Sequence, residues 1–475
     1  MNTKQLRQKI LDLAIRGKLV AQNPNDEPAS VLLERIRAEK ERLIKEGKIK
    51  RDKHSGGGIP ASDKPHYGNT PFELPDGWAW VRLEHISRVI QYGLNNSAEN
   101  SGNFRLLRIT DIQDDKVDWN NVPFTTITND QALEFKLETG DILFARTGAT
   151  VGKSYIVSKI TTSAVFASYL IRVKTMSIYS QYIKHFFGSG MYWEQIIDKS
   201  VGIGQPNVNG TKLKELILPI PPLAEQHRIV TAIESAFAVI DEIERDKTDL
   251  QSAVAAAKRK ILSLAVSGKL VPEDPGDEPA SVLLERIRSE RETLAKAGKT
   301  KRGKTSPATA TRVDTPHYPK LPDSWDVCVL DDILEYEQPT AYIVKSTDYN
   351  DKNKIPVLTA GKSFIIGYTN ESFGSCENLP VIIFDDFTTD SRYVDFKFKV
   401  KSSAMKILRS RIADIKYVFY FMQTIECNHA THKRYWISDY SKKVIALPPL
   451  SEQRRIVTAI ETAFEQLDGI AVTLT

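Results

Sequence analysis

Apolar and polar positions alternate in one regular pattern between Leu223 and Ser267, a stretch that contains neither glycine nor proline. Apolar residues recur there at steps of three and four, with one extra step of three between Ile240 and Ile243 and with Lys247 at one seam position. This spacing is typical of a helix whose apolar stripe forms a coiled-coil seam, and the extra step is a stammer. About 45 residues at a rise of 1.5 Å predict a rod of about 65–70 Å, which needs a partner helix to cover its seam. The predicted seam consists of Val230, Ile233, Phe237, Ile240, Ile243, Leu250, Val254, Ala257, Ile261 and Leu264.

Two blocks of sequence occur twice along the chain. Residues 10–51 match residues 261–302 without a gap, and Pro222–Val230 matches Pro449–Val457. The central copies are joined in one continuous segment, whereas the N-terminus carries only the second half of that segment and the C-terminus only the first half. Complementary ends predict a pseudo-two-fold ring, in which the two ends of the chain together rebuild a second, antiparallel rod. A tandem duplication trimmed at both ends is the alternative.

A shorter amphipathic helix is predicted after each copy of the sequence Gly-Lys-Leu-Val. A Glu-Pro pair marks the start of each helix, and a glycine, Gly47 or Gly298, marks its end. Linkers rich in basic residues, glycine, serine and threonine follow at residues 48–64 and 299–312. These linkers are interpreted either as contacts to a DNA backbone or as solvated tethers.

Two segments that hardly match each other, residues 78–217 and 325–446, lie between the repeated blocks. Short runs of β-branched and aromatic residues predict strands in both, and amphipathic stretches predict helices. Strands in the first segment are predicted at 78–83, 105–109, 141–144, 154–157 and 170–173, with helices at 180–187 and 191–198. Strands in the second are predicted at 327–330, 355–358, 363–368, 381–384 and 397–400, with a helix at 412–424.

We therefore expect an α+β protein, in which long helices join two small mixed α/β domains. The helices are expected to form an antiparallel coiled coil in a pseudo-two-fold circular arrangement. The expected parts are an N-terminal helical half-repeat (1–47), a basic linker (48–77), a first domain (78–217), the central helical repeat (218–298), a second linker (299–324), a second domain (325–446) and a C-terminal half-repeat (447–475).

Composition limits the classes of function. The net charge of +5 is compatible with nucleic-acid binding without requiring it. Three widely spaced cysteines fit neither a set of metal ligands nor a disulfide framework. No run approaches 18 apolar residues, and the N-terminus lacks the apolar core of a signal peptide. We therefore expect a protein of the reducing cytoplasm without a metal site and without membrane contact.

The segment Gly148–Ser154 looks like a phosphate-binding loop, but it has three residues between its glycines where the Walker A motif has four. Nucleotide binding is therefore not expected. The segment is either a tight turn that presents basic and hydroxyl side chains to a DNA backbone or a purely structural turn. The side chains that such a turn would present are Arg146, Thr147, Lys153 and Ser154.

The sequence assigns no catalytic residue and no metal ligand. It contains no nucleophile elbow, no His-Glu-x-x-His motif, no dinucleotide-binding glycine motif and no Asn/Asp-Pro-Pro-Tyr/Phe tetrad of amino-methyltransferases. The acidic pairs Asp114-Asp115 and Asp385-Asp386 are interpreted as loop or capping carboxylates, because no positioned lysine or third ligand accompanies them. His66 and His317, at equivalent positions of the repeat, are interpreted as packing residues.

Polar loops are better candidates for contacts with bases. Amide side chains can pair with adenine edges, and lysine can reach phosphates, although each loop could also be a solvated turn. The candidates in the two loops that precede the Pro-Pro-Leu blocks are Gln205, Asn207, Asn209, Lys212, Lys433, Arg434 and Tyr435. Further candidates on predicted strands and their connections are Arg105, Arg108, Lys362 and Arg392.

The layout resembles the specificity subunit of a Type I restriction-modification system over nearly the whole chain. The second variable segment departs from the family pattern, because Val381–Asp386 stands where the first segment has Asp141–Arg146. The resemblance is carried by the paired Pro-Pro-Leu-x-Glu-Gln-x-Arg-Ile-Val blocks that start at Pro221 and Pro448, by Gly140–Gly148, by Gly204–Asn209 and by the two Asp-Glu-Pro-Ala-Ser helices.

The resemblance implies that two target recognition domains read the two halves of a split, asymmetric DNA site. The helical repeats would set the gap between the halves, and the predicted rod corresponds to about two turns of B-DNA, since one turn is about 34–36 Å. The implied partners are two modification subunits, which bind S-adenosylmethionine and methylate adenine N6, and restriction subunits that use ATP and Mg²⁺. The chain itself would bind none of these cofactors. A fused nuclease or nucleotide-hydrolysing enzyme, and a scaffold that binds proteins but not DNA, are the alternatives.

Overall fold

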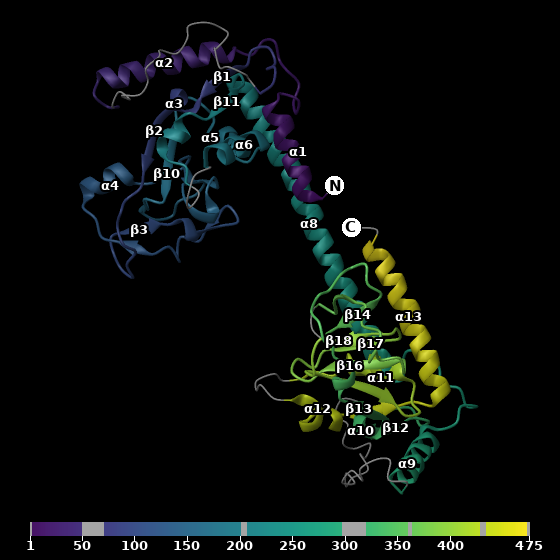
Figure 1. Cartoon of the computed structure of the whole chain (residues 1–475). Helices are drawn as coiled ribbons and strands as arrows, with labels where there is room; N and C mark the ends of the chain where they lie inside the picture. The colour runs from purple at the N-terminus through teal and green to yellow at the C-terminus, as the bar shows by residue number, and fades with distance from the viewer. Residues whose placement is uncertain are drawn as a thin grey trace. The chain divides into compact units, whose positions relative to one another are not determined.

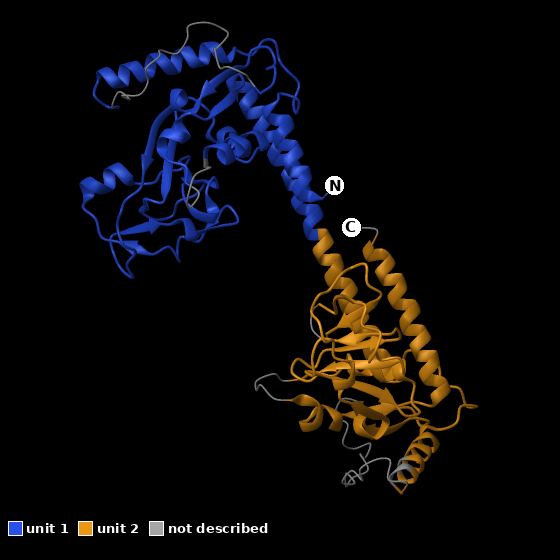
Figure 2. Cartoon of the chain, viewed as in Figure 1, with its two compact units in different colours: residues 1–245 blue, residues 246–475 orange. Residues whose placement is uncertain are grey.

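The computed structural model describes residues 2–49, 71–200, 207–296, 320–359, 363–427 and 434–472. They form two compact units, unit 1 (residues 1–245) and unit 2 (residues 246–475), each with its own core (Figures 1 and 2). The helix α8 (Leu223–Val266) contributes its first half to unit 1 and its second half to unit 2. The greater part of both predicted linkers, with His66 and His317, lies outside the described residues.

Unit 1 is built on a four-stranded antiparallel sheet in the order β2-β10-β7-β8. A smaller sheet, β6-β3-β9, contains the parallel pair β3 and β9, while β1 pairs with β11 and β4 with β5. Its strands are β1 (Ala79–Arg82), β2 (Ser87–Tyr92), β3 (Phe104–Leu107), β4 (Ile112–Gln113), β5 (Lys116–Val117), β6 (Phe124–Thr125), β7 (Ile142–Ala145), β8 (Ser154–Ile156), β9 (Ala164–Phe166), β10 (Leu170–Thr175) and β11 (Ile217–Ile220). Besides α8, its helices are α1 (Thr3–Ile15), α2 (Ala29–Lys45), α3 (Leu83–Ile86), α4 (Asn129–Phe135), α5 (Ser180–Phe186), α6 (Gly190–Ser200) and α7 (Gly210–Lys214).

Unit 2 has a four-stranded antiparallel sheet in the order β13-β19-β16-β17 and a smaller sheet, β15-β14-β18, in which β14 and β18 are parallel. Strand β12 pairs with β20. Its strands are β12 (Asp326–Val329), β13 (Leu334–Glu337), β14 (Ile355–Leu358), β15 (Ile365–Thr369), β16 (Val381–Asp385), β17 (Ser391–Val394), β18 (Lys399–Val400), β19 (Met405–Ser410) and β20 (Val444–Leu447). Its own helices are α9 (Ala280–Lys296), α10 (Leu330–Ile333), α11 (Ile415–Met422), α12 (Tyr435–Ser438) and α13 (Leu450–Val472).

The two units follow one plan although their variable segments hardly match in sequence. Both large sheets place the last strand between the first and the second strand along the chain, and both small sheets pair the first strand with one parallel and one antiparallel neighbour. Phe144 of β7 pairs with Ile171 and Ser154, and Phe384 of β16 pairs with Lys406 and Ser391 in the same register. The sequence predicted two small α+β domains but not that their topology is shared.

The predicted strands and helices of both variable segments are confirmed, with bounds that differ by a few residues. The pattern missed strands that carry charged side chains, such as β19, whose Lys406 is 1% exposed and lies 3.3 Å from the buried carboxylate of Asp386. A charged residue argues against a buried strand unless a partner compensates its desolvation, and that partner comes from another strand. The missed strands also include β2, β9, β13 and β17.

Three segments that are far apart in the sequence meet at a buried carboxylate in unit 1. Glu225, near the start of α8, is 1% exposed and accepts hydrogen bonds from Trp78 Nε1 at 3.0 Å and from Gln22 Nε2 at 2.7 Å. Arg228 Nη2 lies 2.6 Å from Asp26 Oδ2. Burial raises the pKa of Glu225, because removal from water disfavours the charged form. We call these five residues the unit 1 clasp.

The repeated sequence blocks form a matching clasp in unit 2. Glu452 is fully buried and accepts a hydrogen bond from Trp325 Nε1 at 3.0 Å, and Arg455 Nη2 lies 2.6 Å from Asp277 Oδ2. Each clasp therefore joins one copy of the Pro-Pro-Leu block to one copy of the Gly-Lys-Leu-Val block and to the tryptophan that opens a variable segment.

In unit 1 the predicted seam packs against the N-terminal helix, which runs antiparallel to α8 (Figure 1). Val230, Ile233 and Ile240 are buried, and Phe237 is half-buried beneath the guanidinium of Arg7. Ile243 is 50% exposed, so its prediction as a packed seam residue was wrong. The reason is the length of α1, which begins at Thr3 beside Glu244 and therefore ends the packed surface there.

In unit 2 the second half of α8 packs against α13, as the ion pair of Lys258 with Asp468 at 2.6 Å indicates. The most buried residues of this half are Leu262, Ala265 and Val266, because α9 and the domain core cover α8 as well. The predicted seam residues of this half are only half-buried: Leu250, Val254, Ala257, Ile261 and Leu264.

We expect Glu225→Ala to destabilise unit 1 by about 1–3 kcal/mol, because it leaves the buried Trp78 N–H without an acceptor. Glu225→Gln is the matched control, since its amide oxygen can accept from Trp78 and the amide of Gln22 can turn to present its own oxygen. Hydrogen exchange of each unit under mild denaturant measures the effect. Equal protection of unit 1 in the alanine variant and the wild type would contradict the role of the clasp.

The pH dependence of the same pair of proteins provides a second expected outcome. Burial raises the pKa of Glu225 above its ordinary value of 4.5, so the folded unit binds this proton more tightly than the unfolded chain. The wild type therefore loses stability as the pH rises from 4.5 through the raised pKa, and Glu225→Gln lacks this loss. Between pH 4 and 8, the unfolding midpoint of Glu225→Gln should therefore rise relative to that of the wild type as the pH increases.

Candidate nucleic-acid interface

A hollow of about 530 Å³ opens on unit 1 where four connections meet. These connections follow β2, β3 and β7 or join β9 to β10. We call it the loop hollow. It is lined by Leu94, Asn95, Asn96, Ala98, Leu106, Arg108–Thr110, Thr147–Thr150 and Ala167–Tyr169.

The lining combines a fixed cation, amides, hydroxyls and one aromatic ring. The guanidinium of Arg108 lies 2.7 Å from Asp111 Oδ1, and this hydrogen bond raises the pKa of Arg108. Its side chain nevertheless remains 43% exposed, so the ion pair orients the cation without burying it. Asn95 is exposed, and Tyr169 is 62% exposed at the rim. Such a surface offers donors, acceptors and an apolar contact to an incoming ligand.

The structure brings the two polar segments predicted in unit 1 together. Val208 N donates to Arg146 O at 3.0 Å, and Thr147 forms a backbone bridge with Asn207. Arg146 N in turn donates to Tyr169 O at 3.1 Å, so both segments are tied to the rim of the loop hollow. The guanidinium of Arg146 stacks on a ring, 4.8 Å from the centroid of Tyr92.

Other predicted residues of unit 1 are occupied within the fold. Arg105 donates to Val122 O at 2.6 Å and lies 3.8 Å from the ring centroid of Phe124. Asn209 Oδ1 caps α7 by accepting from Lys212 N at 2.9 Å, and the Lys212 ammonium donates to Lys199 O.

The remaining predicted residues of unit 1 differ in their exposure. Ser154 O accepts from Lys184 Nζ at 2.5 Å, whereas Lys153 is exposed on the turn. Gln205 lies outside the described residues. Of the predicted residues, Arg108 and Thr147 line the loop hollow itself.

Sequence reasoning missed Asn95, Asn96, Ser168 and Tyr169. Each follows a predicted or observed strand at the same side of the fold, which is the signal that could have found them. That signal was hidden because β2 and β9 were not predicted, so the ends of these strands were not recognised.

In unit 2 the prediction for Tyr435 was wrong. The residue is 1% exposed, because its ring lies in the core at the start of α12 and its N–H donates to Asp386 O at 2.9 Å. Arg434 is exposed, and Arg392 is exposed on β17, with its guanidinium 5.9 Å from the ring centroid of Phe364. Lys362 and Lys433 lie outside the described residues.

Asp115 and Asp385 are loop or capping carboxylates, as predicted, whereas Asp386 is buried 3.3 Å from Lys406, so the prediction that no positioned lysine accompanies this pair was wrong. Asp385 Oδ1 accepts from the N–H groups of Phe387 and Thr388 at 2.8 and 2.9 Å, and Asp115 forms an ion pair with Lys184 at 2.8 Å. No group of three or more histidine, cysteine, aspartate or glutamate side chains is placed to hold a metal within the described ranges. The helices of the described part of the chain include none that is long and apolar enough to cross a membrane.

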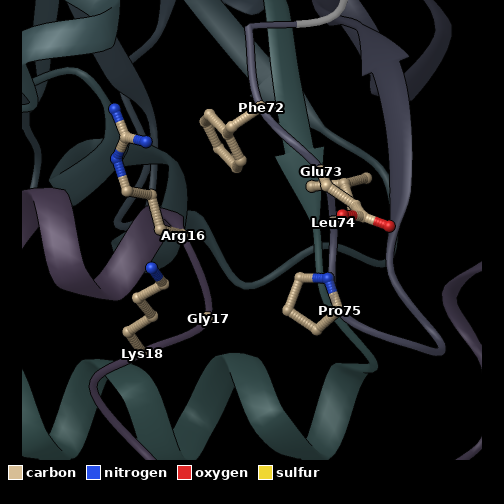
Figure 3. A pocket seen from close by; sticks show the side chains of 7 residues that line it. All are labelled: Arg16, Gly17, Lys18, Phe72, Glu73, Leu74 and Pro75. Atoms are coloured by element: carbon tan, nitrogen blue, oxygen red, sulfur yellow. The ribbon is translucent and has the colours of Figure 1, made fainter.

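A second hollow, of about 470 Å³, lies at the clasp end of unit 1 between residues 16–18 and 72–75 (Figure 3). The guanidinium of Arg16 lies 4.7 Å from the ring centroid of Phe72, and Gly17 faces Pro75. Gly17 has a φ of +65°, and a Cβ there would collide with Pro75 Cγ and lie 3.2 Å from the Trp78 ring. This close approach lets the Gly-Lys-Leu-Val turn close over the tryptophan of the clasp.

Comparison with known proteins identifies relatives of the chain. A family model described as Type I restriction modification DNA specificity domain matches residues 75–251 and 322–471. The Type I restriction enzyme EcoAI specificity subunit of Escherichia coli is 31% identical over 395 residues, which cover 70% of this chain and 62% of that protein. The EcoR124I/EcoR124II specificity subunit of Escherichia coli is 54% identical over 126 residues, 25% of this chain and 31% of that protein. The chain therefore spans less than two thirds of the length of these relatives.

A solved structure from work on complex assembly and conformational transition of the type I R-M system aligns with a TM-score of 0.55. The alignment covers 85% of this chain and 94% of that chain at 17% sequence identity. At this identity the likeness bears on the fold alone, and it agrees with the mixed α/β architecture described above.

Gly17→Ala should lower the free energy of unfolding of unit 1 by about 1–3 kcal/mol more than Gly47→Ala does. Both glycines have positive φ, +65° and +70°, but a Cβ at Gly47 meets nothing within 4 Å. The difference between the variants therefore isolates the collision with Pro75 from the backbone strain. Urea unfolding followed by tryptophan fluorescence measures it, and identical midpoints would show that the turn has room for a side chain.

Proposed function

This chain belongs to the family of Type I restriction-modification DNA specificity domains, and we propose that it is the specificity subunit that reads DNA for such a complex. The observation that carries the proposal is the loop hollow, where Arg108, Thr147 and the rim residue Tyr169 converge from separate connections of unit 1. Duplex DNA is the proposed ligand, and the chain contributes recognition rather than a catalytic residue.

The chemistry of the loop hollow suits the edges of base pairs. Asn95 and Asn96 carry amides that can pair with adenine N6 and N7, and Arg108 can pair with guanine O6 and N7. The exposed ring of Tyr169 offers an apolar contact to a thymine methyl or a sugar. Lys153, exposed on the neighbouring turn, is placed to reach a phosphate.

The shared topology of the units supports a bipartite target. Each unit repeats the same sheet order and the same clasp, while the connections that would face DNA differ in sequence. We propose that each unit reads one half of an asymmetric site. The family model matches once in each variable segment, which supports two readers in one chain.

The circular, pseudo-two-fold arrangement and its coiled coil remain part of the proposal. In unit 1 the N-terminal half-repeat packs on the Pro222–Val230 block, and in unit 2 the central repeat packs on the Pro449–Val457 block. These matching contacts support a ring in which the helical repeats set the gap between half-sites. The seven-part domain organisation expected from the sequence belongs to the same proposal.

The partners follow from the proposed role. Two modification subunits would dock on the helical repeats and methylate adenine N6 with S-adenosylmethionine, and restriction subunits would use ATP and Mg²⁺. This chain would bind none of these cofactors, and the complex would work in the cytoplasm. The alternative of nucleotide hydrolysis at Gly148–Ser154 is disfavoured, because this segment leads into strand β8 rather than into the helix that a phosphate loop requires.

Exchange of residues 84–215 for those of another family member should change one half of the methylated site and leave the other half unchanged. The cut points keep the β1–β11 pair and the unit 1 clasp in place. The measurement is the mapping of methylated adenines in DNA after coexpression with modification subunits. A change in both halves, or in neither, would contradict the two-reader proposal.

The double variant Asn95→Ala/Tyr169→Ala should weaken discrimination at one or two positions of the same half-site by about 1–3 kcal/mol. Asn120→Ala is the matched control, because Asn120 is an exposed asparagine of unit 1 that does not line the loop hollow. Methylation rates on a library of half-site variants report the effect. If Asn120→Ala altered the preference as strongly as the double variant, the loop hollow would not be the reading surface.

A further inference from the structure

The topology identifies which connections of unit 2 correspond to the loop hollow of unit 1. Strand β16 corresponds to β7, and the connection from β18 to β19 corresponds to that from β9 to β10. The turn after β16, residues 386–390, therefore stands where unit 1 has its turn 146–153. Residues 401–404 stand where unit 1 has the segment that ends at Tyr169.

Two backbone hydrogen bonds confirm this correspondence. Asp386 N donates to Ala404 O at 3.2 Å, as Arg146 N donates to Tyr169 O at 3.1 Å. Tyr435 N donates to Asp386 O at 2.9 Å in unit 2. In unit 1 the matching bond, from Val208 to Arg146, measures 3.0 Å. The same three connections thus meet at one junction in each unit.

The junction of unit 2 is held by a buried ion pair, and the lysine of this pair lies 5.5 Å from the ring centroid of Tyr336. Asp386 and Lys406, 2% and 1% exposed, lie 3.3 Å apart, and Asp386 Oδ1 also accepts from Trp436 N at 2.9 Å. Neither group reaches the surface. A ligand at this junction would therefore meet the neighbouring surface residues. These are Thr388, Lys401, Ser402 and Ser403, and all four are exposed.

The backbone of the turn is strained at Thr389. Thr389 has a φ of +61°, a left-handed conformation that is unfavourable for a β-branched residue. Its neighbours hold it there, since Asp385 Oδ1 accepts from the N–H groups of Phe387 and Thr388, and Thr389 N donates to Asp385 O at 3.0 Å. Strain held by surrounding contacts concentrates at functional sites, where it fixes the position of nearby groups.

We propose that the turn Asp386–Asp390 and the segment Lys401–Ser403 form the surface with which unit 2 reads DNA. Thr388, Ser402 and Ser403 contact base edges through their hydroxyls, and Lys401 contacts a phosphate. This assignment rests on the proposed function and replaces Arg392 and Tyr435 as the candidates of unit 2. A hydroxyl donates to or accepts from several base edges, so its selectivity depends on how firmly the turn is placed.

The test uses the full chain assembled with modification subunits, and it maps adenine methylation on a DNA library randomised in both half-sites. Thr388→Ala/Ser403→Ala should reduce the preference for the favoured base by about fivefold or more at one or two positions of one half-site. The other half-site should stay unchanged. Thr462→Ala/Ser372→Ala is the matched control, because it removes two exposed hydroxyls of unit 2, one on α13 and one between β15 and β16, that lie outside the connections corresponding to the loop hollow.

A second variant separates reading from folding. Thr389→Gly should raise the melting temperature, because glycine adopts a φ of +61° without strain, yet it should lower discrimination in the same half-site as the double alanine variant. If the turn has only a structural role, Thr389→Gly should raise the melting temperature and discrimination together, or change the melting temperature alone. Unchanged discrimination in Thr389→Gly would overturn the role of the strained turn.

The outcomes distinguish this assignment from the proposed function. If both half-sites are read with wild-type selectivity in Thr388→Ala/Ser403→Ala while Arg392→Ala alters one of them, the surface assignment fails and the function stands. If the wild-type complex methylates adenines without any sequence preference, the proposed function itself fails. A selective change confined to one half-site, absent from the control, supports the assignment.

Discussion

The hydrogen bond from a buried tryptophan to a buried carboxylate is the constraint on which each unit depends. Glu225 and Glu452 could not remain in the interior without their donors, because burial alone disfavours the charged form. Those donors come from segments far apart in the chain. Each clasp therefore forces a helical half-repeat, the opening of a variable segment and the Pro-Pro-Leu block to meet, and the sheets are anchored at that meeting point.

This anchoring leaves the opposite ends of the strands free to vary. The large sheets of the two units share their order and register, yet the junction after β7 is filled by Arg146 over Tyr92, and the junction after β16 is filled by Asp386 with Lys406. Arg146 stacks on an aromatic ring, whereas Asp386 forms a buried ion pair. A constant frame with exchangeable connections suits a protein that must present different chemistry to two different ligands.

The candidate site was only partly accessible to sequence reasoning. Arg108 and Thr147 were recognised because basic and hydroxyl residues follow clear strands, and the structure places both in the loop hollow. Asn95 and Tyr169 were missed because β2 and β9 are short or carry polar residues. Tyr435 was misjudged because an aromatic residue beside basic ones suits a DNA contact as well as a core, and only packing distinguishes the two.

The sequence by itself determined the repeats, the long helix, most strands of both variable segments and the family resemblance. These features are local or repeated, so periodicity and matching blocks reveal them. Only the tertiary structure decided that the two variable segments share one topology, that Ile243 is exposed and that three separate connections converge at each junction. The physical reason is that burial and convergence depend on contacts between segments distant in sequence. A buried charged group, for example, is stable only when a partner from another segment compensates its desolvation.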